Sequence, residues 1–228
     1  MAAGSSGGSP RADDWYRSAD WDDAAQGEFA RRLARARAGN RVQYRRIKAI
    51  ALIRSGDPAR QAAGAGLLEE HLADATVYAY ERTLAHVLLA DLARSRGDLA
   101  AAEAHVREAL RISGPDGSGT SGEEEILLAE ILLERGGRER VEEAQALLDR
   151  RADDRPSLFV RSRHRLYVAQ TRASLALGDR KKATEWARAA LDAASAQPSG
   201  LRYHPTLGLV PDDPELRRWL DGVASGRV

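Results

Sequence analysis

Apolar residues recur along most of the chain at intervals of three and four, the spacing of one face of an α-helix. Four such segments end at a glycine and read IKAIALIRSGD, LLADLARSRGD, LAEILLERGG and RASLALGD. An alanine-rich segment follows each of them. The hydrophobic pattern therefore predicts an all-α protein in which helices follow one another through short glycine turns.

The turn glycines lie at a nearly constant interval. Taking the second glycine of the pair in the third segment, they are Gly56, Gly97, Gly137 and Gly178, at spacings of 41, 40 and 41 residues. A fixed period in this range is typical of helical solenoids, in which each unit buries its apolar face against the next. An ordinary helical bundle is the alternative fold.

The residue after the turn indicates how the next helix begins. Glycine ends a helix in the left-handed conformation at little energetic cost. Asp57, Asp98 and Asp179 directly follow three of the turn glycines, and aspartate is a favoured N-cap. We therefore expect each glycine–aspartate pair to close one helix and open another.

The second repeat resembles the tetratricopeptide repeat. Leu89 and Ala90 fit that family's Leu-Gly pair, Gly97 its turn glycine, and Ala102 and Ala109 its two alanines. Small residues at these positions let two antiparallel helices approach closely. The resemblance implies a right-handed α-solenoid of about four helical hairpins over residues 41–196.

The last repeat is similar to the same family, while two repeats depart from it. The matching residues of the last repeat are Tyr167, Gly178, Ala183, Ala190 and Leu191. The first and third repeats carry the insertions PARQAAGAG and RERV after their turns. The resemblance is therefore close in two repeats and loose in the other two.

The two ends of the chain are expected to cap the solenoid. Residues 1–14 are predicted to be a disordered tail, and residues 15–228 a single domain. A helix is expected over residues 22–38, ending at Gly39, and a capping segment over residues 199–228. Asp213 followed by Pro214 predicts a helix start in that last segment, because proline suits the first helical position. The expected aromatic anchors of the two caps are Trp15, Tyr16, Trp21, Tyr203 and Trp219.

The resemblance also implies a binding surface. In tetratricopeptide proteins the first helix of each hairpin lines a concave groove that holds a peptide. The residues that fall on this face are Gln43, Arg46, Arg54, Asp91, Arg94, Glu123, Glu130, Glu134, Arg165 and Arg172. Such a charged set suits an extended protein or peptide partner whose carboxylates are bound by arginine. The alternative is that these charges pair with each other.

A basic segment indicates a second candidate function. Residues 31–48 contain no acidic residue. Arg41, Arg45 and Lys48 are spaced for one helical face, with Tyr44 beside them. Such a face could bind the phosphates of a nucleic acid, although the net charge of the whole chain is only +1.

Catalysis has little support in the sequence. The chain has no cysteine, and its five histidines show no metal-ligand spacing, so no cofactor and no metal site are expected. Tyr203 and His204 are the pair that could form a lid or carry acid–base chemistry. The absence of a signal peptide and of a membrane-spanning segment predicts a cytoplasmic protein. The preference for alanine and arginine suggests a bacterial one.

Overall fold

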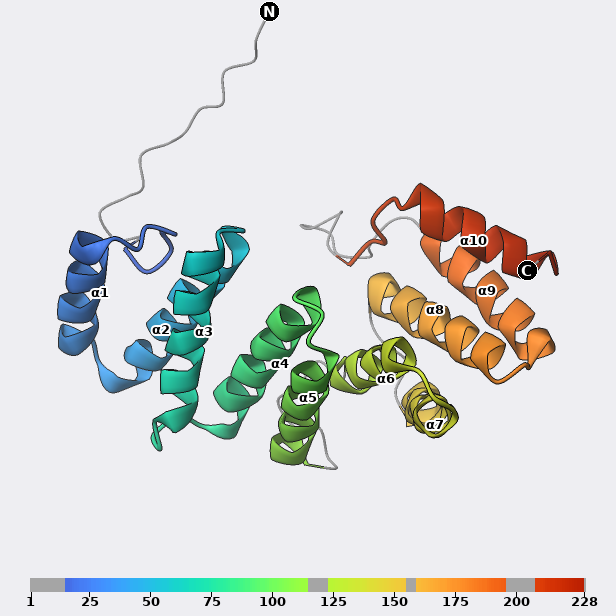
Figure 1. Cartoon of the computed structure of the whole chain (residues 1–228), viewed down its shortest axis with the longest axis horizontal. Coiled ribbons are helices and arrows are strands. Elements are labelled where there is room, and N and C mark those ends of the chain that lie inside the picture. The colour runs from blue at the N-terminus through green and yellow to red at the C-terminus, as the bar shows by residue number, and fades with distance from the viewer. Residues whose placement is uncertain (1–14, 115–122, 155–158, 196–207, 228) are drawn as a thin grey trace, which may run out of the picture. The chain divides into compact units, whose positions relative to one another are not determined.

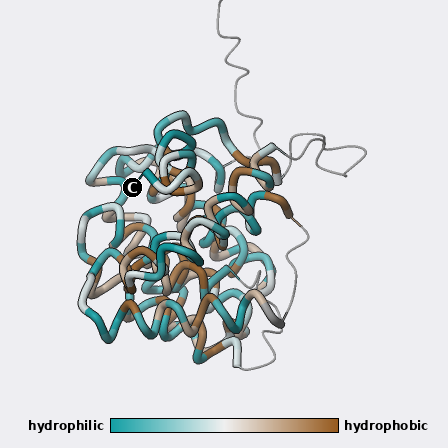
Figure 2. Tube along the Cα trace, turned by 90° about the vertical axis from the view of Figure 1, so that its right-hand side faces the viewer, coloured by the Kyte–Doolittle hydropathy of each residue, from teal (hydrophilic) through white to brown (hydrophobic). Residues whose placement is uncertain are grey.

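The structure is a computed structural model that describes residues 15–114, 123–154, 159–195 and 208–227. These residues form ten α-helices and no strand, so the predicted all-α class is confirmed. None of the helices in the described ranges is long and apolar enough to cross a membrane. Figure 2 shows hydrophobic and hydrophilic positions following each other along the helices, as the sequence pattern predicts.

The chain divides into two compact units, which are residues Met1–Arg96 (unit 1) and Gly97–Val228 (unit 2). The described helices of unit 1 are α1 (Asp23–Arg35), α2 (Ala38–Arg54), α3 (Pro58–Ala73) and α4 (Ala79–Ser95). Those of unit 2 are α5 (Leu99–Ser113), α6 (Glu124–Arg135), α7 (Arg138–Asp154), α8 (Val160–Ala176), α9 (Arg180–Ser195) and α10 (Pro214–Ala224) (Figure 1). The single domain expected over residues 15–228 stays a prediction.

The predicted turn glycines all lie between two helices. Gly56, Gly97, Gly137 and Gly178 have φ between 76° and 90°, the left-handed region in which a side chain is strained. We call the helix before each turn a first helix (α2, α4, α6 and α8) and the helix after it a second helix (α3, α5, α7 and α9).

The predicted aspartate caps are also confirmed. The carboxylate of Asp57 accepts a hydrogen bond from Arg60 N at 2.8 Å. Those of Asp98 and Asp179 accept from the residues three positions on, both at 3.0 Å. Asp213 likewise accepts from Leu216 N at 2.9 Å and begins α10.

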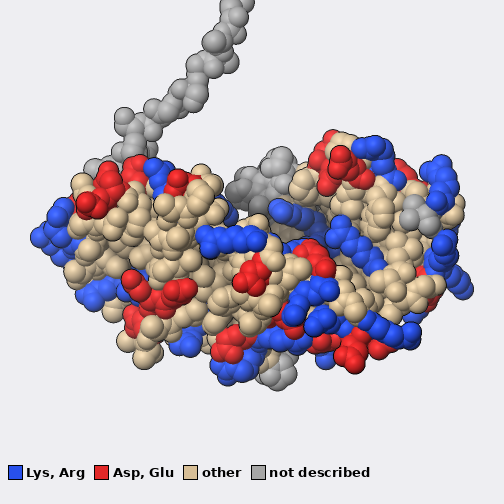
Figure 3. All heavy atoms as spheres, viewed as in Figure 1, with Lys and Arg blue, Asp and Glu red and all other residues tan. Residues whose placement is uncertain are grey.

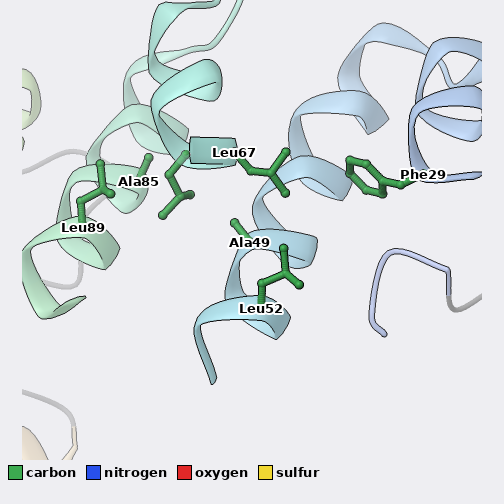
Figure 4. Packing of buried hydrophobic residues seen from close by; sticks show 7 residues of the cluster. Phe29, Ala49, Leu52, Leu67, Ala85 and Leu89 are labelled. Atoms are coloured by element: carbon green, nitrogen blue, oxygen red, sulfur yellow. The ribbon is translucent and has the colours of Figure 1, made fainter. Parts of the chain in front are cut away.

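The hydrophobic core of unit 1 is formed by α1 to α4. In it, α2 packs on α1, α3 and α4, and α3 also packs on α4. The buried residues are Phe29, Ala49, Leu52, Leu67, Leu68, Ala85 and Leu89 (Figure 4). The expected N-terminal anchors Trp15, Tyr16 and Trp21 pack against this core.

The first predicted helix boundary is wrong. The helix expected over residues 22–38 ends at Arg35, and Gly39 lies inside α2 rather than at a helix end. The guanidinium of Arg41 donates hydrogen bonds to Ala34 O at 2.9 Å and Ala36 O at 2.7 Å. An arginine from the next helix thus satisfies terminal carbonyl groups of α1 that a glycine cap would otherwise satisfy.

The helices of unit 2 pack in sequence order. In addition, the two first helices α6 and α8 contact each other directly. The last helix, α10, packs on α9, where Leu220 and Val223 join Ala183, Ala187 and Ala190 in a buried cluster. The expected C-terminal anchor Trp219 packs against the same cluster.

Candidate functional site

A pocket of about 420 Å³ lies in unit 2 at the N-terminal ends of α6 and α8. Its lining residues are Glu123, Phe159, Arg161, Ser162, Arg165 and Gly208. Two of them, Glu123 and Phe159, are the N-cap residues of these two helices. Gly208 comes from the segment that precedes α10.

One side of the pocket is a fixed network of ion pairs. Arg165 donates two hydrogen bonds to the carboxylate of Glu130, at 2.7 and 2.9 Å, and a third to Glu123 at 3.3 Å. The hydroxyl of Ser162 donates to the other carboxylate oxygen of Glu123. Bidentate arginine–carboxylate geometry is rigid, so this network joins α6 to α8 and holds one side of the pocket in place.

The other side of the pocket presents accessible groups. The ring of Phe159 is 43% exposed, which is unusual for a large apolar side chain. The side chain of Arg161 is exposed and forms no ion pair with any acid in the described ranges. The pocket therefore offers an aromatic surface and a guanidinium group side by side.

Gly208 packs directly on that aromatic ring. Its carbonyl oxygen accepts a hydrogen bond from Arg161 N at 2.8 Å, in the first turn of α8. A Cβ at this position would lie 2.6 Å from Cδ1 of Phe159, and the φ of 76° also favours glycine. Gly208 thus lies at the start of α8, in contact with Phe159.

The structure brings three of the predicted groove residues of unit 2 together. Glu123, Glu130 and Arg165 form the network described above. The guanidinium of Arg172 instead lies over the ring of Trp219, 5.7 Å from its centroid. Arg165 is therefore already bound by carboxylates of its own chain.

The same is true of Arg46 in unit 1. Its guanidinium donates to both carboxylate oxygens of Glu81, at 2.6 and 3.3 Å, and Glu81 is buried. This bond joins α2 to α4, just as Arg165 and Glu130 join α8 to α6, and each pair is separated by 35 residues. Of the other predicted groove residues, Gln43, Arg54, Asp91 and Glu134 are exposed and Arg94 is half-buried.

A buried histidine lies beside the Arg46–Glu81 pair. His71 of α3 is fully buried, and its Nε2 is 3.9 Å from a carboxylate oxygen of Glu81. Neither ring nitrogen has a hydrogen-bond partner within the described structure. Burial lowers the pKa of His71 below its ordinary value, an effect that the Glu81 carboxylate opposes. The ring is therefore uncharged at neutral pH.

Lys48 was assigned to the basic face considered as an alternative, phosphate-binding surface. That assignment is wrong, because Lys48 is only 1% exposed. Its amino group donates to the carbonyl oxygens of Ser18 at 2.7 Å and Asp20 at 2.9 Å. It also lies 5.3 Å from the ring centroid of Trp21, within cation–π range. Burial lowers the pKa of this amine. Lys48 anchors residues 18–21 to α2 and cannot reach a phosphate from there.

The two arginines of that face also have partners within the chain. Arg45 bonds Asp74 at 3.4 Å, and its side chain is only 16% exposed. Arg41 bonds the end of α1, as described above. The spacing rule placed all three residues on one face but could not show that each of them bonds another part of its own chain.

Two sets of residues complete the comparison with the sequence. Tyr203 and His204, the predicted lid or acid–base pair, lie outside the described residues. No group of three potential metal ligands occurs in the part of the chain that is described. Sequence reasoning missed Phe159, Arg161, Ser162 and Gly208. Their one sequence signal is an aromatic residue and an arginine at the start of a helix, which is common.

Comparison with known proteins identifies no relative of this chain. No protein-family model, no curated protein and no solved structure matches this chain.

Proposed function

We propose that this chain is a non-catalytic scaffold that binds a segment of a protein partner on the first-helix face of a tetratricopeptide-like solenoid. In unit 2 that face contains the pocket between the starts of α6 and α8. The observation that carries the proposal is the exposed pair in this pocket, Phe159 and Arg161, beside a wall that is already fixed. Exposed aromatic and arginine side chains are enriched in protein interfaces.

The packing of the helices supports the solenoid part of the proposal. The first helices α2 and α6 each pack on their own second helix and on the next first helix, as in stacked hairpins. The ion pairs follow the same order. Arg46–Glu81 and Arg165–Glu130 join first helices, while Arg107 and Glu143 join the second helices α5 and α7 at 2.8 Å.

The arginines of the face divide into two roles under this proposal. Arg46 and Arg165 are structural, because each is bound by a partly or fully buried glutamate. Arg161 is the residue that contacts the partner, because its side chain is exposed at the pocket. We expect the bound segment to place an apolar side chain on Phe159 and an acidic group near Arg161.

Panning a phage-displayed random peptide library on the full-length protein tests the proposal. The selected peptides are then measured against a Phe159→Ala, Arg161→Glu variant. The matched control is Leu177→Ala, Lys181→Glu, which changes an exposed apolar residue at the other end of α8 and an exposed basic residue in the first turn of α9.

The expected outcome is a set of peptides that bind the parent and the control with equal affinity but bind the pocket variant at least about tenfold more weakly. Peptides that bind the pocket variant as well as the parent would show that the site lies elsewhere. Circular dichroism of each variant confirms that the helices remain folded.

A further inference from the structure

Exposed large hydrophobic side chains are few in the described part of the chain, and three of the four lie at the starts of two helices. Within the described ranges they are Tyr78, Tyr80, Phe159 and Leu177, with exposed fractions of 59%, 47%, 43% and 38%. The first two lie at the start of α4, and Phe159 lies at the start of α8. Apolar surface that a fold leaves exposed in one place commonly marks a contact site.

The starts of α4 and α8 are built in the same way. Tyr78 and Phe159 each occupy the N-cap position, and neither helix has a side-chain cap. They are 81 residues apart, which is two repeat periods. Three residues further on, a buried polar side chain bonds the preceding first helix: Glu81 bonds Arg46, and Ser162 bonds Glu123.

Unit 2 shows what such a helix start can bind. The carbonyl oxygen of Gly208 accepts from the N–H of Arg161, the second residue of α8, and the glycine lies against the ring of Phe159. The occupant is thus a stretch of irregular backbone with a glycine at the ring. It supplies from outside the helix the acceptor that a side-chain cap would otherwise provide.

The start of α4 in unit 1 has the same donor and ring, and hydrogen-bond acceptors from the described residues do not reach that donor. The N–H equivalent to that of Arg161 belongs to Tyr80, and it has no acceptor within the described part of the chain. The ring of Tyr78 is more exposed than that of Phe159. A tyrosine ring contributes contact area while its hydroxyl stays hydrated, which suits a surface that is free in one state and covered in another.

We propose that the start of α4 is a second docking site, which takes an irregular or extended segment of the protein partner. A carbonyl oxygen of that segment accepts from the N–H of Tyr80, and a glycine or other small residue packs on the ring of Tyr78. The inference rests on the proposed function in one respect, namely that the partner is a polypeptide. It adds a site in unit 1 and specifies the backbone chemistry of what binds there.

The chain supplies a probe for this site. The peptide TLGLVPDD has the sequence of residues 206–213 and includes the glycine that lies on Phe159. Labelled with fluorescein, it is titrated with the full-length protein and followed by fluorescence anisotropy. The variants are Tyr78→Ala, Phe159→Ala and, as the matched control for loss of an exposed apolar side chain, Leu177→Ala. A second peptide, TLALVPDD, replaces the glycine by alanine.

We expect the glycine peptide to bind the parent and the Leu177→Ala control equally. The Tyr78→Ala variant is expected to bind it about tenfold more weakly, and the alanine peptide is expected to bind the parent more weakly by a similar factor. No measurable binding to the parent, or binding that persists in Tyr78→Ala, overturns the inference. Binding that is lost in Phe159→Ala but not in Tyr78→Ala also overturns it, yet leaves the proposed function standing. The library selection tests that function separately.

Discussion

Two glycines in the middle of α3 provide a matched pair for testing how closely the first and second helices pack. Gly64 is buried against α2, where a Cβ would lie 2.9 Å from the carbonyl oxygen of Ala49 and 2.9 Å from Cγ1 of Ile53. Gly66 lies two residues further along the same helix, and a Cβ there would meet no atom within 4 Å. Alanine is therefore blocked at the first position and accommodated at the second.

The expected magnitudes follow from two opposing effects. Replacing glycine by alanine inside a helix stabilises it by about 1 kcal/mol, and this gain applies to both positions. At Gly64 the new methyl group also forces apart two helices whose contact includes backbone, a cost of roughly 1–3 kcal/mol. We expect Gly66→Ala to raise the free energy of unfolding of unit 1 by up to about 1 kcal/mol, and Gly64→Ala to lower it by about 1 kcal/mol.

Urea unfolding measured by tryptophan fluorescence tests this prediction. The chain has four tryptophans, and Trp15 and Trp21 lie in unit 1 while Trp186 and Trp219 lie in unit 2. Replacing the latter two by phenylalanine restricts the signal to unit 1. This separation matters because two units that unfold independently do not give a single two-state transition.

The comparison between the two variants is the decisive quantity, because the gain in helix propensity cancels in it. If Gly64→Ala proves as stable as Gly66→Ala, the close approach of α2 and α3 is not a constraint on the fold. The argument that a small residue sets the distance between these helices would then be wrong.

Three further predictions concern buried polar groups. Burial lowers the pKa of His71, so protonation of this ring favours the unfolded state. Unit 1 is therefore expected to keep its stability above the unfolded-state pKa of about 6.5 and to become less stable as the pH falls below that value. Urea titrations at several pH values should show this decrease, and His71→Leu should reduce it. Lys48→Met removes two hydrogen bonds to residues 18–21 and is expected to make Trp21 more accessible to acrylamide quenching, whereas Lys181→Met, at an exposed site, should have no effect. Arg165→Ala removes two hydrogen bonds to the mostly buried carboxylate of Glu130 and should destabilise unit 2 by about 2 kcal/mol, and Glu130→Ala in the same chain should recover part of that loss. Additive effects in this double-mutant cycle would contradict the role given to the pair.

The helices and their turns could be predicted because their causes are local. A glycine with φ near 80° and an aspartate that caps the next helix act within a few residues. The turns at Gly56–Asp57 and Gly178–Asp179 can therefore be predicted from the sequence. The boundary at Gly39 was mispredicted because its cause is not local. Arg41 reaches back to cap α1 from the next helix, which removes the need for glycine there.

The candidate site was only partly predictable for a related reason. The resemblance to the tetratricopeptide repeat placed Glu130 and Arg165 on first-helix faces, but it could not show that they bind each other rather than a partner. Arg46 was likewise predicted to bind a partner, whereas in the structure its guanidinium bonds Glu81. Phe159 and Gly208 lie far apart in the sequence, so no pattern along the chain could bring them together.

The sequence by itself determined that this protein is helical and where the helices joined by the glycine turns end and begin. These properties depend on interactions between neighbours in the chain. Only the tertiary structure decided which charges are available to a partner. Ion pairs such as Arg46–Glu81 and buried groups such as Lys48 are formed between helices, and burial depends on what packs against a face rather than on the face alone.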